Sequence, residues 1–206
     1  GDGGVNNRVV RLNMTDGTNT LARHPDWVTG GTSDDTETFN SPHSIAYHEP
    51  SASLLVADRD NFRIDVLDAA TGVKLSEWKN CLGNGTGPAV APWGVRMFTE
   101  PTTGHVQAMV AVCDSPEDGG NQRIVVLDVT SPDAFETLSA STETSTDKIQ
   151  CNAVAEMAVD PDICLTPHEI SVDPRTGDIY VACVTVDPGP SAILRYRRTA
   201  AGATAL

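Results

Sequence analysis

Short apolar strands alternate with polar turns along this chain, and no segment shows the 3.6-residue apolar period of an amphipathic helix. One strand pattern, an arginine followed by β-branched residues and leucine, recurs about every 55 to 70 residues. Its copies are residues 8–12, 63–67, 123–127 and, more loosely, 192–196. Short strands bounded by polar turns predict an all-β protein, and their recurrence predicts a repeat fold.

Two further strands precede each of the last three copies. The nearer strand is rich in small and β-branched residues, and its copies are 54–57, 108–112 and 179–182. The farther strand begins with a proline, and its copies are 42–46, 92–96 and 167–172. Several short strands per unit, repeated at this length, predict the blades of a β-propeller.

The repeat predicts that the whole chain, residues 1–206, is one propeller segment. Its nearly complete blades are expected at about 40–80, 90–135 and 165–198. Residues 1–30 are expected to be the remnant of an earlier blade, and the polar segments 29–39 and 136–150 to be loops between blades.

A propeller has to close, because each blade covers the apolar face of its neighbour and an open ring leaves two faces wet. Three blades and a remnant do not close a ring. We therefore expect that the chain is part of a longer protein, lost N-terminal blades to processing, or is completed or capped by another chain.

Composition and charge narrow the function classes. The chain has 28 acidic and 14 basic side chains, for a net charge of −14, so its surface repels phosphate backbones and nucleic-acid binding is not expected. No apolar run reaches the roughly 18 residues of a membrane-spanning helix. Two sequons, at Asn13 and Asn84, are potential N-glycosylation sites. Together these features predict a secreted protein, either extracellular or in the lumen of the secretory pathway.

The five cysteines include no close C-x-x-C pair, so a zinc site built on cysteines is not expected. In an oxidising compartment they predict two disulfides with one thiol left over. We expect Cys151 to pair with Cys164, because both lie in one irregular insertion. The odd count also fits a cysteine whose partner lies outside this chain.

Two histidines occupy the same place in different blades. His43 and His168 each follow the proline that begins the innermost strand of a blade, and Trp93 holds this place in the blade between them. Side chains at that place converge on the propeller axis, so two imidazoles there predict a divalent-metal site, most simply zinc. The alternative is that each histidine only caps a strand turn.

Arg59 is the second candidate, in the turn that follows the middle strand of the blade containing His43. A guanidinium there would hold a carboxylate or stabilise a developing oxyanion. The alternative is a local salt bridge to Asp58 or Asp60.

These residues resemble a known family, the peptidyl-α-hydroxyglycine α-amidating lyases. Residues 39–46 and 56–64 are similar to its patterns F-x-x-P-H-S and V-A-D-R-E-N-G-R-I. Residues 166–170 with 178–181 look like its later P-H-D-I and Y-I-G-D blade, and residues 2–10 look like its D-G-Y-x-N-S-R-I-V segment. The likeness spans most of the chain in order, and the block from His43 to Arg63 is its specific part.

Members of that family are six-bladed propellers of the NHL type, with four-stranded blades, a zinc ion held by three histidines, and a structural calcium. The resemblance implies that this chain supplies about three and a half of six blades. It implies His43 and His168 as zinc ligands, Arg59 as a catalytic arginine, and Glu169 as a calcium ligand. The implied reaction, that of a carbon–nitrogen lyase, is the cleavage of a peptidyl-α-hydroxyglycine into a peptide amide and glyoxylate, with a peptide or small-molecule ligand in the central channel.

The chain also departs from the family. Gly4 stands where the family has a catalytic tyrosine, Thr166 stands where it has a methionine, and nothing here matches the blade that carries its first zinc ligand. These departures keep open an alternative function, in which a non-catalytic NHL propeller serves as an extracellular binding or structural module in a larger glycoprotein assembly.

Overall fold

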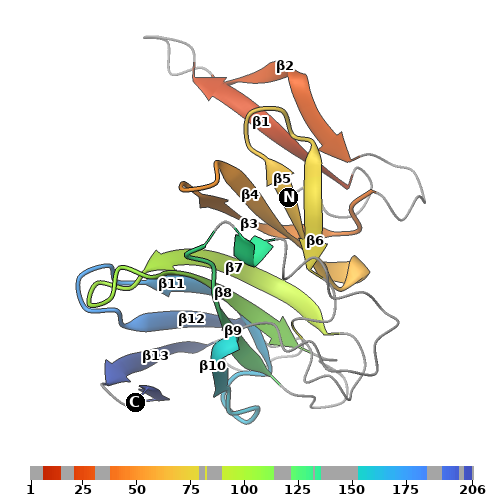
Figure 1. Ribbon diagram of the computed structural model, residues 1–206. Coiled ribbons are helices and arrows are strands. Elements are labelled where there is room, and N and C mark those ends of the chain that lie inside the picture. Colours follow the sequence, from red (N-terminus) through yellow and green to blue (C-terminus); the bar gives the residue numbers. More distant parts are fainter. Residues whose placement is uncertain are drawn as a thin grey trace, which may run out of the picture.

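The predicted all-β propeller architecture is confirmed: the computed structural model is a partial β-propeller of antiparallel sheets (Figure 1). The structure describes residues 7–14, 21–30, 38–78, 82, 90–113, 122–131, 133–135, 153–184, 192–199 and 202–205. A two-stranded sheet, β1 (Arg8–Met14) with β2 (Leu21–Gly30), comes first in the chain. Three four-stranded sheets follow it.

Each four-stranded sheet is one blade, with its strands side by side in chain order. The first blade comprises β3 (Pro42–His48), β4 (Ser53–Asp58), β5 (Arg63–Asp68) and β6 (Lys74–Trp78). A short 3-10 helix, η1 (Arg59–Asn61), joins β4 to β5. The middle blade comprises β7 (Ala91–Thr99), β8 (Val106–Cys113), β9 (Arg123–Asp128) and β10 (Ala153–Ala158). The last blade comprises β11 (Thr166–Val172), β12 (Ile179–Val184), β13 (Ala192–Thr199) and β14 (Gly202–Ala205).

Two of the predicted boundaries differ from the structure, one at β10 and one at β2. Because β10 pairs with β9, the middle blade runs to Ala158, and the segment 136–152 connects two strands of one blade, not two blades. Residues 29 and 30, expected in a loop, are the end of β2. β10 is mostly exposed and lacks the apolar run that marks β8 and β9, so its sequence does not predict a strand.

The continuous apolar runs of the middle strands have a physical cause, because both of their faces are buried. In β8, Ala108, Val110 and Val112 pack in a core shared with the first blade. The alternate residues Met109 and Ala111 pack in a second core, shared with the last blade. A third core joins β1 and β2 to the first blade. Each interface is therefore a sheet-on-sheet contact made by side chains of period two.

The last blade is covered on one face only. Along β12, Val181 and Cys183 are buried, whereas the alternate residues Ala182 and Val184 are exposed. On β13, Ile193 is 77% exposed. The described chain is therefore an arc of a propeller whose last blade presents a sheet face to solvent.

One turn motif recurs in all three blades. It begins with an acidic residue, which is followed by two variable residues, a threonine and a glycine. Its copies are residues 68–72, 100–104 and 173–177. In each copy the glycine N–H donates to the main-chain oxygen of the acidic residue at 2.8 Å, and the glycine has a positive φ. The acidic side chain accepts main-chain N–H groups of the turn, as Glu100 does from Thr102 at 3.0 Å. Hydrogen bonds from Thr103 and Thr102 lower the pKa of Glu100 to about 2.

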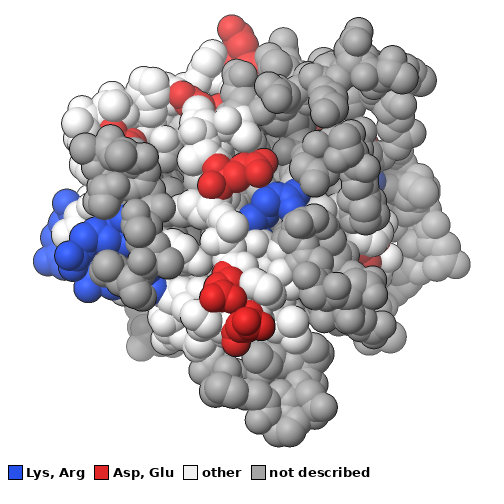
Figure 2. All heavy atoms as spheres, turned by 90° about the horizontal axis from the view of Figure 1, so that it is seen from below, with Lys and Arg blue, Asp and Glu red and all other residues white. Residues whose placement is uncertain are grey.

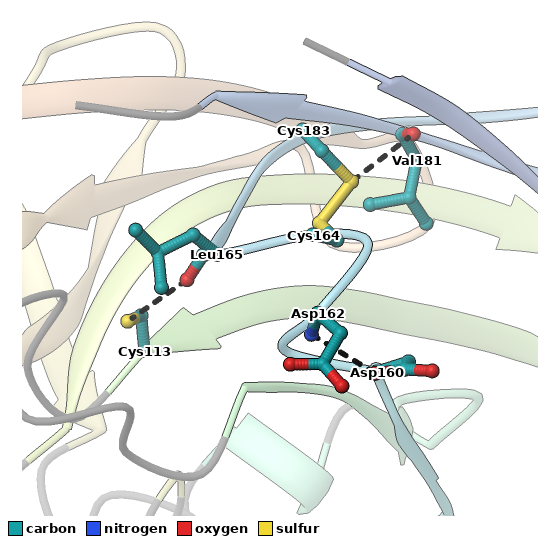
Figure 3. Close-up of a disulfide and its surroundings, with 7 residues drawn as sticks. All are labelled: Cys113, Asp160, Asp162, Cys164, Leu165, Val181 and Cys183. Carbon is teal, nitrogen blue, oxygen red and sulfur yellow. Dashed lines mark hydrogen bonds between the residues drawn. A yellow bond between two sulfur atoms is a disulfide. The ribbon is translucent and has the colours of Figure 1, made fainter. Parts of the chain in front are cut away.

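The predicted Cys151–Cys164 disulfide is wrong for Cys164, which is bonded to Cys183, with 5.2 Å between the two Cα atoms. Pro167 of β11 lies opposite Cys183 of β12, so this register brings Cys183 close to Cys164, just before β11. Figure 3 shows the bond joining the turn before β11 to β12. Cys151 lies outside the described residues, and the buried Cys113 lies 4.0 Å from the main-chain oxygen of Leu165.

Among the described residues, no helix has the length and apolar character needed to cross a membrane. Figure 2 shows one face of the molecule, where acidic atoms are scattered and basic atoms form one group at the left edge and a smaller group near the centre. Of the two sequons, Asn13 lies in β1 and is half-buried, and Asn84 lies outside the described residues.

Gly94 allows the middle and last blades to approach each other closely. A Cβ atom at this position of β7 would lie 2.8 Å from the main-chain oxygen of His168 and 3.2 Å from the Cα atom of Glu169. Both neighbours are backbone atoms, so a side chain at position 94 would have to push β11 away.

We therefore expect Gly94→Ala to lower the free energy of unfolding by about 1–3 kcal/mol, the usual cost of overpacking. Urea denaturation followed by circular dichroism measures this difference. A free energy within about 0.5 kcal/mol of wild type, the usual range of neutral surface substitutions, would show that the two strands are not this close.

Candidate axial site

The three candidate positions on the innermost strands share a local structure that places them alike. His43, Trp93 and His168 lie on β3, β7 and β11, and β7 contacts both of the other strands. In each strand the residues on either side of the candidate pair with consecutive residues of the neighbouring strand, and the candidate itself has no partner there. The pairing register shifts between Pro42 and Ser44, between Pro92 and Gly94, and between Pro167 and Glu169. Each candidate is therefore the extra residue of a β-bulge, a feature that re-aims side chains next to active sites.

The structure brings the three side chains together. The ring centroids of His43 and His168 are 4.5 Å apart, and those of His43 and Trp93 are 5.0 Å apart. The Trp93 and His168 rings are 5.4 Å apart. Residues separated by up to 125 positions thus form one cluster, which we call the axial cluster.

His43 is held in one tautomer. Its Nδ1 lies 2.7 Å from the main-chain oxygen of Trp93, and because a carbonyl only accepts, Nδ1 carries the proton. Burial lowers the pKa of His43, and the neighbouring His168 and Arg59 lower it further. Its Nε2 therefore keeps a lone pair. Histidine metal ligands show this same arrangement, in which one ring nitrogen donates to a carbonyl and the other binds the metal.

Arg59 lies beside the axial cluster on η1. Its Nε is 2.7 Å from Asp60 Oδ1, its Nη2 is 3.2 Å from Asp60 Oδ2, and its Cζ atom is 4.6 Å from the centre of the Trp93 ring. Of the two aspartates that could form a local salt bridge with Arg59, Asp60 forms it. Asp58 instead pairs with Arg63, at 2.9 Å.

Glu169 belongs to a polar contact among the three innermost strands. Its Oε2 accepts from Ser44 Oγ at 3.4 Å, and Ser44 Oγ accepts from the N–H of Val95 at 3.2 Å. The described residues contain no group of three His, Cys, Asp or Glu side chains arranged to hold a metal ion. The candidate ligands are therefore the imidazoles of His43 and His168 for zinc and the carboxylate of Glu169 for calcium.

The other described histidine rings lie away from the axial cluster. His48, at the end of β3, is 1% exposed and packs against Phe135. His105 lies 2.9 Å from Asp128 in an exposed pair.

No protein-family model matches the chain. It is 27% identical to human (Homo sapiens) NHL repeat-containing protein 3 over 183 residues, which cover 88% of this chain and 42% of that protein. It is 28% identical to the protein of the same name from Mus musculus over 182 residues, again 88% of this chain and 42% of the relative. The chain therefore spans less than half the length of these relatives. Their similarity supports an NHL-repeat family and does not support the amidating lyases in particular.

Among solved structures, the chain is similar to a protein of unknown function from Bacteroides caccae, with a TM-score of 0.45 and 11% sequence identity. That match covers 95% of this chain and 55% of the other.

Proposed function

We propose that the axial cluster is the metal-binding part of a lyase-like site, in which His43 and His168 bind zinc and Arg59 binds the carboxylate of the substrate. The observation that carries the proposal is the His43–His168 pair, whose rings lie 4.5 Å apart at equivalent bulges of two blades. Neither His43 Nε2 nor either ring nitrogen of His168 makes a hydrogen bond within the described part of the chain. Catalytic zinc sites use three protein ligands, so the third ligand lies outside the described residues.

The proposed reaction is the cleavage of a peptidyl-α-hydroxyglycine at its C–N bond, which yields a peptide amide and glyoxylate. Zinc, when bound, acts as a Lewis acid on a substrate oxygen. The neutral His43 is kept in its ligating tautomer by the Trp93 carbonyl. The Arg59 guanidinium binds the negative carboxylate of the substrate. In the same proposal Glu169 is a ligand of a structural calcium ion.

The test uses the full-length protein, purified with and without added zinc. We expect about one zinc ion per chain and release of glyoxylate from a hydroxyglycine peptide. His43→Ala or His168→Ala is expected to weaken zinc binding by more than about 100-fold. This is more than the loss caused by removing a residue that only hydrogen-bonds to a metal ligand. His105→Ala, which changes the exposed pair with Asp128, should leave both measurements unchanged. A wild-type protein that binds no zinc and releases no glyoxylate would refute the proposal.

A second candidate is a non-catalytic propeller that binds a partner outside the cell, and two observations favour it. Two of the Arg59 nitrogens are already paired with Asp60. The Cys164–Cys183 disulfide is compatible with an extracellular protein. In that case a His43→Ala/His168→Ala protein keeps full partner binding in a pull-down, and loss of binding would count against this candidate.

A further inference from the structure

Left-handed backbone is concentrated around Arg59. In the described chain four residues other than glycine have positive φ, and three of them surround η1: Asn7 (38°), Ser41 (56°) and Phe62 (55°). The fourth, Ala52, lies in the turn between β3 and β4. Such conformations are unfavourable for L-amino acids and gather where the surrounding structure imposes them, often at functional sites.

Hydrogen bonds connect these strained residues to Arg59. The Asn7 side chain accepts from the Ser41 N–H at 3.1 Å, and the Ser41 main-chain oxygen accepts from the Arg59 N–H at 3.3 Å. Ser41 Oγ donates to Asp60 Oδ2 at 2.6 Å. The Phe62 N–H donates to the Arg59 main-chain oxygen at 3.1 Å, which closes the turn. The loop before β3 therefore fixes both Arg59 and its acidic partner.

The Arg59 guanidinium is held in two directions. Asp60 accepts from Nε and Nη2, and the Cζ atom of Arg59 lies over the Trp93 ring, 4.6 Å from its centre. Nη1 makes no hydrogen bond within the described residues. A planar guanidinium fixed along one edge and one face is pre-organised, because little further freedom is lost when a ligand binds the remaining edge.

Trp93 also contacts the other members of the axial cluster. Its main-chain oxygen accepts the His43 proton at 2.7 Å, and its ring touches those of His43 and His168. One residue therefore sets the tautomer of a proposed metal ligand and the position of the arginine.

We infer that Ser41, Asp60 and Trp93 are positioning residues that hold Arg59 beside the axial histidines, with Nη1 left to bind a carboxylate of the ligand. The inference rests on the proposed function, in which Arg59 faces the substrate, and it adds the residues that orient Arg59. Asp60 and Trp93 act through Arg59, so their loss weakens carboxylate binding and leaves zinc binding intact.

The experiment titrates the full-length protein with glyoxylate as the carboxylate probe and records the Arg59 Nε–H signal by NMR. Asp60→Asn and Trp93→Leu are expected to weaken glyoxylate binding by about 10-fold, the effect of one lost charge-assisted contact, and to broaden the Arg59 signal. Trp93→Phe keeps an aromatic face and should restore binding to within about 3-fold of wild type. The matched control is Asp173→Asn, because Asp173 pairs with Arg175 through the same two nitrogens, at 3.2 and 3.1 Å, in an exposed turn. This variant should bind glyoxylate like wild type.

The two proposals fail in different ways. Zinc content tests the histidine pair and is expected to be unchanged in the Asp60 and Trp93 variants. The positioning role is overturned if wild type does not bind glyoxylate, if Asp60→Asn and Trp93→Leu bind it as wild type does, or if Trp93→Phe loses as much as Trp93→Leu.

Discussion

Replacing Arg63 with leucine is expected to lower the free energy of unfolding by about 3–5 kcal/mol, the usual cost of breaking a buried ion pair. The Arg63 side chain is 3% exposed, and its Nε lies 2.9 Å from Asp58 and 3.1 Å from Asp65. Those two carboxylates are 0% and 1% exposed, so leucine would remove the only cation beside Asp58 among the described residues and would leave Asp65 paired with Lys74 alone, at 2.9 Å. Guanidinium chloride denaturation measures the loss.

The pH dependence of this variant provides a second measurement. Burial raises the pKa of Asp58 to about 6, above the value of 3.8 expected for an unfolded chain. Between these values the folded state binds more protons, so the Asp58 contribution to stability is present at low pH and is lost as the pH rises through 6. Removal of Arg63 raises the pKa of Asp58 further, so the deficit of Arg63→Leu should be smaller at pH 5 than at pH 8.

Arg175→Leu is the matched control, because the Arg175 side chain is 85% exposed and pairs with one surface aspartate. It should change stability by less than about 0.5 kcal/mol. An Arg63→Leu protein as stable as this control would contradict the account of the first blade.

Removal of the Cys164–Cys183 disulfide is expected to cost about 3 kcal/mol, as for other loops of this length. The two cysteines are separated by 19 positions, and both are buried in the core between the middle and last blades. The unfolded chain without this bond gains conformational freedom, while the folded chain keeps the same sheet pairing. The Cys164→Ala/Cys183→Ala variant, compared with wild type in urea under non-reducing conditions, measures the difference.

Treatment with a reducing agent distinguishes the contribution of this disulfide to stability from that of any other disulfide. It should lower the unfolding midpoint of wild type by more than that of the double variant. Equal unfolding midpoints of wild type and double variant before reduction would show that Cys164 and Cys183 do not stabilise the last blade.

The middle strands could be predicted because a strand that is buried on both faces has a continuous run of apolar residues. The central residues of β4 (54–57), β8 (108–112) and β9 (124–127) are all apolar, since alternate residues enter different cores. The outer strand β10 has one buried residue in six and therefore shows no apolar run. Proximity in sequence predicts the wrong partner for Cys164, because the register of β11 and β12 decides which cysteines meet.

Within the axial cluster, the repeated proline start predicted the positions of His43, Trp93 and His168 but not their bulges, which depend on the pairing of each strand with its neighbour. The choice of Asp60 over Asp58 as the partner of Arg59 also needed the fold. Asp58 points into the blade towards Arg63, and this follows from burial, which the sequence pattern does not resolve.

Zinc titration followed through the imidazole ¹⁵N signals of the full-length protein tests the shared histidine site most directly. We predict that the signals of His43 Nε2 and of one ring nitrogen of His168 shift together and saturate at one zinc ion per chain, while those of His48 and His105 do not respond. Signals of His43 and His168 that remain unchanged, or that saturate at different zinc concentrations, would contradict a common metal site.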